Sequence, residues 1–397
     1  MAKLSLKDLE LKGKTVVMRV DFNVPLKNGV IGDDNRIRQA LPSINHVIDA
    51  GAKLVLLSHL GRPKGEPKPE FSLKPVANHL EDLVSCKVWF GEDCIGPKAE
   101  EAVSKASPGE IVLLENVRFH PGETKNDADF SKSLAAHGDV FVNDAFGSSH
   151  RAHSSVAGIT EHLQPAAAGF LLQKEIDYLQ ESVENPKRPF VAVLGGAKVS
   201  DKIGVIENLI TKVDTIIIGG GMTYTFYKAM DLPIGNSLLE EDKVDLAKSL
   251  LEKAKENKVE IMLPLDSVVG REFKEDTEHK TVPQDGIEDG WMALDIGPKS
   301  AELFGDEIKK AKTVIWNGPM GVFEMDAFAQ GTFAVAGAMS SATENGAITI
   351  IGGGDSASAI KKAGLEEQVS HVSTGGGASL EYLEGKELPG ITSLTDK

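Results

Sequence analysis

The sequence contains little cysteine: Cys86 and Cys94 are the only two among its 397 residues. Two cysteines cannot form a disulfide framework, and neither has the neighbouring cysteines or histidines of a zinc motif. No apolar run approaches the length that crosses a bilayer, and the first residues, MAKLSLKDLELKGKTVV, lack the apolar core of a signal peptide. We therefore expect buried or unreactive thiols and a cytoplasmic protein with no membrane partner.

Positive charge is also scarce, since the formal net charge is −16 at pH 7. This charge argues against non-specific binding to nucleic acid or to an anionic membrane, because both would repel the chain. Residues 1–170 contain 20 Lys and Arg against 22 Asp and Glu, which gives −2 and leaves −14 for the rest. Six of the eight arginines and eight of the ten histidines also lie there. This distribution indicates a small-anion site in the first half, with chance clustering as the alternative.

The composition that is present is globular, with 41% apolar and 26% charged residues, in a chain longer than one hydrophobic core usually organises. Short apolar runs alternate with helical patterns, which is typical of parallel sheets covered by helices on both faces. We predict an α/β fold of two doubly wound, Rossmann-like domains. The predicted strands lie in KTVVMRVDF, AKLVLLSHL, EIVLLENVRF and DVFVNDAF of the first domain, and in FVAVLGG, DTIIIGGG, VEIMLPLD, TVIWNG and AITIIGGG of the second.

A helical pattern over residues 171–190, LLQKEIDYLQESVENPKRPF, marks the expected junction between the domains. It ends at Asn185, because the residue before a proline leaves the helical region. We predict a first domain over 1–170, a connecting helix over 171–186 whose ends act as hinges, and a second domain over 187–384. The alternative is an ordinary surface helix within one domain.

Polar residues follow the predicted strands of the first half. Ligands of open α/β sheets bind beyond the carboxyl ends of the strands, so side chains from separate strands meet there. Arg36 follows the first strand at an expected helix start, and several arginines so placed could surround one multiply charged anion. Each arginine alone would more often be a solvated surface residue. The other residues at these strand ends are Asp21, Asn23, His59, Arg62, Arg118, His120, Asp144, His150, Arg151 and His153.

Glycine follows the strands of the second half, in GGAK (195–198), GGGM (219–222), NGPMG (317–321), GGGDS (352–356) and STGGGAS (373–379). Glycine lets N–H groups approach phosphate, particularly at a helix start, although a single run is more often only a turn. Asp355 suits a magnesium ion, with helix N-capping as its alternative role. Lys198 and Lys202 would share one helical face and reach phosphates, unless they are ordinary surface lysines. Together these features predict a nucleotide site.

Several nucleotide-binding motifs are absent. The sequence has no GxxxxGK[ST], no HRD and DFG pair, and no GxGxxG after a strand. These absences exclude a P-loop and a protein-kinase site, and they weaken the alternative of an NAD-dependent dehydrogenase. A non-enzymatic two-domain protein that binds a small anion is a further alternative, but it leaves the glycine-rich strand ends unexplained.

Eight segments, in one order along nearly the whole chain, resemble the phosphoglycerate kinase family: VDFNVP, SHLGRP, LLENVRFH, NDAFGSSHRAHSS, GGAKVSDK, WNGPMGVFE, IGGGDS and SHVSTGGGASLE. The resemblance implies reversible phosphoryl transfer from 1,3-bisphosphoglycerate to MgADP, which gives 3-phosphoglycerate and MgATP, with Mg²⁺ as cofactor. It also implies a monomer and a tail over 385–397 that returns to the first domain.

The resemblance also implies two sets of ligand-binding residues. Glu324 would meet the ribose and Asp355 the metal, while Ala293 and Ser356 stand where the family often has glycine and threonine. The phosphoglycerate would bind to Asp21, Phe22, Asn23, Arg36, His59, Leu60, Gly61, Arg62, Arg118, His150 and Arg151. The nucleotide would bind to Gly196, Ala197, Lys198, Lys202, Gly220, Ala293, Asn317, Pro319, Glu324, Gly352, Gly353, Gly354, Asp355 and Ser356.

The implied chemistry needs no general base, because the attacking ADP oxygen is already anionic and the leaving carboxylate is a weak base. Positioning and electrostatic stabilisation of the phosphoryl group should therefore dominate. We expect Arg36 and Lys198 to contact its equatorial oxygens, assisted by N–H groups of 352–354 and 375–377, in particular Gly353 and Gly376. Closure of the two domains would protect the acyl phosphate from hydrolysis.

Overall fold

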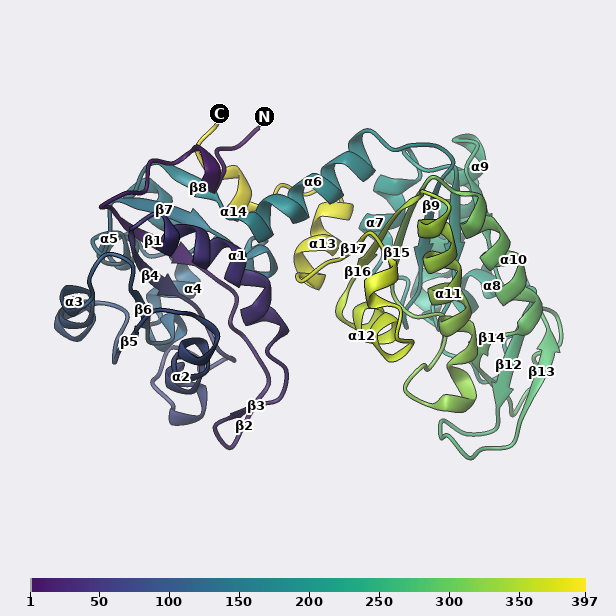
Figure 1. The fold of residues 1–397 in the computed structure, drawn as a ribbon. Coiled ribbons are helices and arrows are strands. Elements are labelled where there is room, and N and C mark those ends of the chain that lie inside the picture. Colours follow the sequence, from purple (N-terminus) through teal and green to yellow (C-terminus); the bar gives the residue numbers. More distant parts are fainter. Residues whose placement is uncertain (1) are drawn as a thin grey trace. The chain divides into compact units, whose positions relative to one another are not determined.

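The computed structural model describes residues 2–397. The chain forms two compact units (Figure 1). Unit 1 runs to Asp177 and includes the tail Glu387–Lys397, and unit 2 comprises Tyr178–Lys386. The boundary falls inside helix α6 (Phe170–Glu184). None of the helices over residues 2–397 combines the length and apolar character that a membrane span requires.

Unit 1 contains a six-stranded sheet whose strands are all parallel. Their order across the sheet is β5-β6-β4-β1-β7-β8. The chain builds outward from β1 on one side and then crosses to β7 on the other, so the crevice for a ligand is expected at the carboxyl ends of these two strands. The strands are β1 (Thr15–Arg19), β4 (Lys53–Leu57), β5 (Val88–Gly91), β6 (Ile111–Leu114), β7 (Val140–Asn143) and β8 (Ala166–Ala168).

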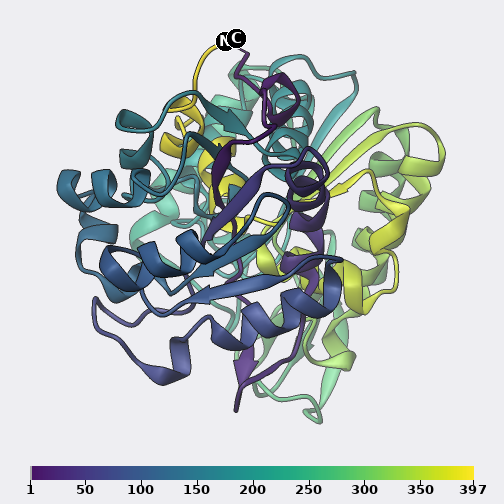
Figure 2. The same ribbon diagram turned by 60° about the vertical axis from the view of Figure 1, so that its left-hand side comes forward.

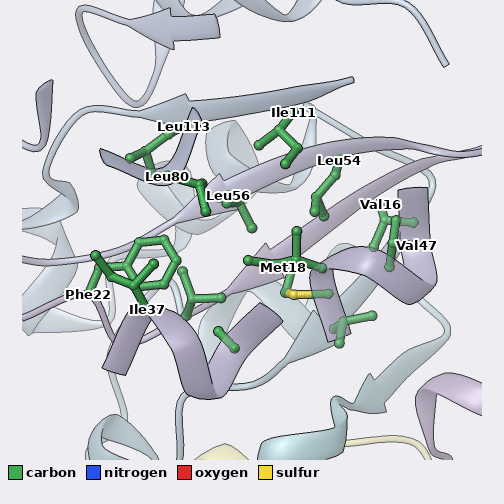
Figure 3. Packing of buried hydrophobic residues seen from close by; sticks show 14 of the residues in the cluster. Val16, Met18, Phe22, Ile37, Val47, Leu54, Leu56, Leu80, Ile111 and Leu113 are labelled. Atoms are coloured by element: carbon green, nitrogen blue, oxygen red, sulfur yellow. The ribbon is translucent and has the colours of Figure 1, made fainter. Parts of the chain in front are cut away.

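Alternate residues of these strands face two buried layers, as expected for a sheet covered on both sides. Val16 and Met18 of β1 pack in the layer that contains Ile37 and Val47 of helix α1 (Asn35–Asp49). Figure 3 shows these side chains together with leucines of the neighbouring strands. Arg19 alternates with Met18 and therefore lies on the opposite face, where it is also completely buried.

The remaining elements of unit 1 are short. They are the hairpin β2 (Leu26–Lys27) and β3 (Val30–Ile31), the helices α2 (Lys74–Leu83), α3 (Gly96–Lys105), α4 (Gly122–Lys125), α5 (Ala128–Ala135) and α14 (Pro389–Thr392), and the 3₁₀ turns η1 (Leu6–Asp8), η2 (Pro69–Phe71), η3 (Val117–Phe119), η4 (Phe146–Ser148) and η5 (Gly158–Glu161). The α5 N-terminus illustrates local encoding: the Asp127 carboxylate accepts a hydrogen bond from the Phe130 N–H at 2.9 Å, which caps the helix.

The C-terminal tail packs within unit 1, against residues far away in sequence. Lys3 forms an antiparallel bridge with Asp396, and Figures 1 and 2 both show the two ends of the chain side by side. The buried Asn143 amide donates hydrogen bonds to the Gly390 carbonyl at 2.8 Å and to the Ser149 hydroxyl at 3.1 Å. The tail is therefore joined directly to the end of strand β7.

Unit 2 contains a second six-stranded parallel sheet. Its order is β11-β10-β9-β15-β16-β17, so in chain order the strands lie 3-2-1-4-5-6, as in dinucleotide-binding folds. The topological switch lies between β9 and β15. The strands are β9 (Phe190–Leu194), β10 (Thr215–Ile218), β11 (Glu260–Met262), β15 (Thr313–Asn317), β16 (Ile348–Gly352) and β17 (His371–Val372).

Successive residues of β9 and β15, such as Ile315 and Trp316, are equally buried. Both faces of this sheet are therefore covered. Three groups of helices pack among themselves: α11 packs with α10 and α12, α8 packs with α9, and α7 packs with α13. The helices are α7 (Ile203–Leu209), α8 (Thr223–Ala229), α9 (Val244–Glu256), α10 (Pro298–Lys310), α11 (Gln330–Glu344), α12 (Gly354–Lys362) and α13 (Gly376–Leu383), with 3₁₀ turns η6 (Glu241–Lys243), η7 (Asp326–Phe328) and η8 (Glu366–Gln368).

The doubly wound fold predicted for each half is confirmed, but the prediction was incomplete. It omitted the parallel strands β5, β8 and β17, which have only two to four residues and so show no clear period. It also omitted a three-stranded antiparallel sheet in unit 2, in the order β13-β12-β14, formed by β12 (Asp266–Gly270), β13 (His279–Pro283) and β14 (Met292–Ile296).

The shared helical face predicted for Lys198 and Lys202 is wrong. Helix α7 begins at Ile203, so Lys202 is its N-cap and Lys198 lies in the irregular loop that precedes it. The glycines at 195–196 let the backbone turn tightly after β9 and thereby delay the start of the helix. Asp355 is likewise not an N-cap: Gly353 occupies that position and Asp355 stands in the first turn of α12.

Asp144, the residue after β7, is completely buried at the start of helix α6. Its Oδ1 accepts hydrogen bonds from the N–H groups of Leu171 at 2.9 Å and Leu172 at 3.2 Å. Burial raises the pKa of this carboxyl to about 6, because desolvation outweighs the backbone hydrogen bonds that favour the charged form. Asp144 therefore holds α6 against unit 1 and is not a ligand-binding residue of the strand edge.

Replacing Asn143 with alanine should destabilise unit 1 by about 2 kcal/mol, because the buried Gly390 carbonyl would lose its donor. Denaturant unfolding would measure this loss, and carboxypeptidase should remove the loosened tail faster. Asn78→Ala, at an exposed position of helix α2, is the control and should change stability by less than about 0.5 kcal/mol. An unchanged tail in the Asn143 variant would contradict the anchoring role.

The raised pKa of Asp144 predicts how the stability of unit 1 changes with pH. Its stabilising contribution is full below the unfolded-state value of 3.8 and is lost as the pH rises through about 6. Relative to wild type, Asp144→Asn should therefore gain about 2 kcal/mol in free energy of unfolding between about pH 4 and pH 7. Amide hydrogen exchange in the strands of unit 1 would measure it, with the exposed Asp129→Asn as control. A difference that does not vary with pH would rule out the burial of this charge.

Candidate functional site

A basic cavity lies at the carboxyl edge of the sheet in unit 1. Its volume is about 590 Å³, and three of the arginines predicted at strand ends line it: Arg62 after β4, Arg118 after β6 and Arg151 after β7. Lys64 and Lys125 add two further cations. The rest of the lining is Gly65, His120, Pro121 and Thr124, so no carboxylate faces the cavity. Such a cavity suits an anion with more than one charge.

The loop after β1 is joined to the loop after β4 beside this cavity. The Asn23 side chain accepts a hydrogen bond from the Gly61 N–H at 2.8 Å, and the Arg118 guanidinium donates to the Gly61 carbonyl at 2.9 Å. Arg36 pairs with the Asp21 carboxylate at 2.9 Å. These bonds hold the predicted residues in one network, although Asp21, Asn23 and Arg36 do not line the cavity itself.

Arg19 supports this network from beneath. This completely buried guanidinium donates to the Ser155 hydroxyl at 2.8 Å, and that hydroxyl donates in turn to the buried Glu123 carboxylate at 2.7 Å. Arg19 also approaches the His59 Nδ1 at 3.0 Å. Because arginine only donates, the His59 Nδ1 must accept, which places the ring proton on Nε2.

The two histidines of this layer are neutral at physiological pH. Burial, reinforced by Arg19 and Arg118, lowers the pKa of His59 well below its ordinary value and that of His153 to about 4. Burial also lowers the pKa of Arg118, to about 10, which still leaves this guanidinium charged. The positive charge of the site therefore comes from arginine and lysine, while His59 and His153 contribute as polar, uncharged groups.

Two residues of the predicted phosphoglycerate set have side chains that cannot reach a ligand. Phe22 and Leu60 are buried in the hydrophobic core of unit 1. Only their backbone groups remain for a ligand, and the Phe22 N–H is already bonded to the Ser58 hydroxyl at 2.9 Å. The His150 ring contacts the Arg151 guanidinium at 3.0 Å, so it adjoins a cavity residue without lining the cavity.

A second cavity, of about 440 Å³, lies in unit 2 at the switch between β9 and β15. Seven residues of the predicted nucleotide set line it: Gly196, Ala197, Gly220, Ala293, Pro319, Glu324 and Asp355. Two acids, Glu324 and Asp355, are both exposed, and the glycine residues expose backbone in the wall. This lining offers backbone, apolar surface and two carboxylates, which suits a nucleotide with a metal ion.

Two glycines permit the close backbone packing that shapes this cavity. A Cβ atom at Gly220 would lie 2.5 Å from the Gly196 carbonyl oxygen, and one at Gly318 would lie 2.2 Å from the Gly195 carbonyl oxygen. Both residues also have positive φ angles, of 71° and 100°. Any other residue would separate the loops that follow β9, β10 and β15.

Several predicted nucleotide residues support the cavity without lining it. Lys202 donates to the Asn317 amide oxygen, and the buried Asn317 Nδ2 has no partner among the described residues. Burial lowers the pKa of Lys202, with Asp355 among the acids that oppose this shift. The buried Ser356 hydroxyl accepts a hydrogen bond from the Gly318 N–H at 2.6 Å, and Lys198 is exposed.

The helices α12 and α13 begin beside each other at the glycine-rich loops. Gly353 and Gly375 are their N-caps, and a Cβ atom at Gly376 would lie 3.0 Å from the Gly354 nitrogen. Gly352 is the last residue of β16. Two helix N-termini thus direct their free N–H groups toward the same region, an arrangement that favours a phosphate.

The sequence did not identify every residue of the two sites. Arg19 was overlooked although an arginine inside the apolar run VVMRV is itself a signal, since a buried charge requires partners. Lys64 was also not predicted, although it lies only two residues after Arg62. In unit 2, Leu238 and Phe273 line the cavity and are exposed by 48% and 63%, yet no sequence pattern marks them.

Comparisons with known proteins agree in their result. The phosphoglycerate kinase family model matches residues 6–386. Two relatives called phosphoglycerate kinase, from Chloroherpeton thalassium and Moorella thermoacetica, are each 56% identical over the full length of both chains. Solved phosphoglycerate kinase structures from Coxiella burnetii and Pyrococcus horikoshii superpose with TM-scores of 0.90 and 0.80, at 43% and 32% identity, over 98% of each chain.

The resemblance stated from the eight sequence segments is confirmed. Neither a dehydrogenase nor a non-enzymatic anion-binding protein finds support among these relatives. The chain therefore belongs to the phosphoglycerate kinase family and is a phosphotransferase of glycolysis.

Proposed function

We propose that unit 1 binds phosphoglycerate, that unit 2 binds ATP or ADP with Mg²⁺, and that the chain transfers a phosphoryl group reversibly between them. The observation that carries this division is the basic cavity of unit 1, whose lining has five cationic side chains and no carboxylate. A phosphorylated carboxylic acid has the matching charge at both of its ends. The cavity of unit 2 has the complementary character, with glycine backbone and two acids.

In unit 1 we assign Arg62, Arg118 and Arg151 to direct contacts with the anion. Asp21 orients Arg36 through their ion pair, and Asn23 holds the Gly61 loop in place. His59 would donate through Nε2 as an uncharged group, since Arg19 occupies its other nitrogen. His150 positions Arg151, whose guanidinium it contacts.

In unit 2 we assign the apolar surface around Leu238, Phe273 and Ala293 to the base, which explains why large apolar side chains lie exposed there. Glu324 would bind the ribose hydroxyls. The N–H groups at the starts of α12 and α13 and the ammonium of Lys202 would bind the phosphates. Asn317 would use its unpartnered amide nitrogen for the same purpose.

Asp355 is the residue that we assign to Mg²⁺. Its exposed carboxylate lines the cavity and offers a hard oxygen, and Mg²⁺ in nucleotide sites typically takes one or two carboxylates together with phosphate oxygens. The residues present therefore fit the ion. When bound, Mg²⁺ would neutralise charge on the nucleotide phosphates.

The catalytic work of the chain's own residues is positioning and charge stabilisation. We propose that Arg36 and Lys198 contact the oxygens of the phosphoryl group while it is transferred, and that N–H groups near Gly353 and Gly376 assist them. No residue needs to remove a proton, because the attacking and leaving oxygens are anionic. Closure of the two units around both substrates would protect the acyl phosphate from hydrolysis. We further propose a cytoplasmic monomer.

The proposed reaction is tested by following NADH oxidation in the presence of ATP, Mg²⁺, 3-phosphoglycerate and added glyceraldehyde-3-phosphate dehydrogenase. We expect rapid oxidation that requires ATP, Mg²⁺, 3-phosphoglycerate and the added dehydrogenase together. A folded protein that binds nucleotide without turnover would refute the proposal. Reduction of NAD without the added enzyme would instead point to a dehydrogenase.

Arg36→Ala should reduce kcat by about 10²-fold or more while nucleotide affinity stays within about twofold, because Arg36 belongs to unit 1 and stabilises only the transferred group. The matched control is Arg38→Ala, an exposed arginine of the same helix that pairs with Asp34 at 3.0 Å. Steady-state kinetics and calorimetric ADP binding give the two readouts. An equal loss of nucleotide affinity would contradict the assignment of the units.

Asp355→Ala should remove most of the effect of Mg²⁺ on nucleotide binding. We expect wild-type ADP affinity to rise about tenfold or more when Mg²⁺ replaces EDTA, and the variant to show little difference. Calorimetry under both conditions measures this, with the exposed Asp306→Ala on α10 as control. A full Mg²⁺ effect in the variant would place the ion elsewhere.

A further inference from the structure

Asp93, Cys94 and His120 lie together at the edge of unit 1, where His120 lines the basic cavity and the other two have no role assigned above. Asp93 and Cys94 follow strand β5, and His120 follows the 3₁₀ turn η3 beyond the neighbouring strand β6. One ligand atom from each residue, an oxygen, a sulfur and a nitrogen, lies within 4.8 Å of the other two. Within residues 2–397 this is the group of three or more such residues that meets the geometry for a shared ion.

Hydrogen bonds and ring stacking hold the Asp93 and His120 side chains beside Cys94. The Asp93 Oδ1 accepts hydrogen bonds from the Cys94 N–H and makes a contact with the His120 Nε2, both at 2.7 Å. The His120 ring stacks on Phe130 with a centroid distance of 5.2 Å and an interplanar angle of 28°. Side-chain rotations that bring all three distances between the ligand atoms to about 3.4 Å would give the spacing of a tetrahedral zinc site.

The burial of the group leaves one side open. Cys94 is completely buried, whereas the side chains of Asp93 and His120 are exposed by 38% and 29%. An ion would therefore take the thiolate from the interior and keep its outward position for water. Three protein ligands and one open position are the arrangement of an accessible zinc ion.

The donor set selects the class of metal. Sulfur and imidazole nitrogen favour Zn²⁺ and similar borderline ions over Mg²⁺, which requires oxygen ligands.

We propose that Asp93, Cys94 and His120 form a binding site for one thiophilic divalent cation, such as Zn²⁺, distinct from the Mg²⁺ of the nucleotide. The sequence did not predict this site, because Cys94 and His120 are 26 residues apart and belong to no zinc motif. The adjacency of β5 and β6 brings them together.

An ion at this site would also act on the basic cavity, because His120 is part of both. It would turn the ring away from its present position and add positive charge and bulk at the rim. We therefore expect Zn²⁺ to raise the KM for 3-phosphoglycerate by about fivefold or more, an effect that rests on the proposed function of unit 1.

The site itself is tested without any activity measurement, by titrating the full-length protein with Co²⁺ in the absence of nucleotide. We expect one equivalent to produce the near-ultraviolet charge-transfer band of a cobalt thiolate, and Zn²⁺ to abolish it. Cys94→Ser should lose the band and Asp93→Asn should weaken binding about tenfold or more. Cys86→Ser, which alters the other free cysteine, is the matched control and should retain the band.

Two results would overturn the site: no thiolate band in the folded wild-type protein, or a band that survives in Cys94→Ser and disappears in Cys86→Ser. If Cys94→Ser fails to fold, Asp93→Asn provides the test. The asparagine side-chain oxygen can still accept the hydrogen bond from the Cys94 N–H, so this variant should fold. Unchanged cobalt affinity in a folded Asp93→Asn protein would refute the site.

The effect on the cavity is decided by steady-state kinetics at saturating MgATP, with and without Zn²⁺. We expect the KM for 3-phosphoglycerate to rise in wild type and Cys86→Ser but not in Asp93→Asn. A wild-type KM that stays constant while cobalt still binds would refute only the link between site and cavity. Absence of turnover before any Zn²⁺ is added would refute the proposed function and leave the metal site to the spectroscopic result.

Discussion

In both units the parallel strands end at a single edge of the sheet, and ladder hydrogen bonds hold the following loops there. Arg62, Arg118 and Arg151 are separated by up to 89 residues in sequence, yet each follows a strand of the same sheet and lines one cavity. The same constraint collects the glycine loops of unit 2 around the switch between β9 and β15. The sites therefore inherit their geometry from the sheets rather than from local motifs.

The basic cavity at the sheet edge of unit 1 rests on a buried layer whose own charges need partners. Arg19 and Glu123 are both fully buried, a costly state for any charge that lacks partners. The Ser155 hydroxyl satisfies both, since it accepts from the guanidinium and donates to the carboxylate. This layer keeps His59 and His153 uncharged, so the two buried rings add no positive charge beneath the cavity.

The nucleotide site that we propose in unit 2 has a different requirement, because a nucleotide presents a flat base, a sugar and a chain of phosphates. The exposed Leu238 and Phe273 would offer apolar surface for the base, while the glycines at 220 and 318 allow three loops to pack backbone against backbone. In this proposal the phosphates would be bound by N–H groups at two helix starts rather than by a P-loop. This explains how a chain without the common nucleotide motifs can belong to a kinase family.

The sequence alone determined the fold class, the alternation of strands and helices, and the residues at the strand ends, because these depend on local periodicity and on which residues follow each apolar run. It also carried the family, through eight segments such as IGGGDS. It did not determine which of those residues share a cavity. Phe22 and Leu60 lie in segments of the family pattern, yet their side chains belong to the core, and Asp144 stands at a strand end but binds the backbone of helix α6.

Only the tertiary structure decided contacts between residues remote in sequence, because strand adjacency is not written in any local pattern. It showed that β5 and β6 are neighbours and so placed His120 beside Asp93 and Cys94. It showed that α7 begins only at Ile203, which separates Lys198 from the helix, and it joined Asn143 to Gly390 across 247 positions. In each case the outcome depends on packing between helices and strands. The free energy of that packing arises only when the core is assembled, so no single segment of the sequence determines it.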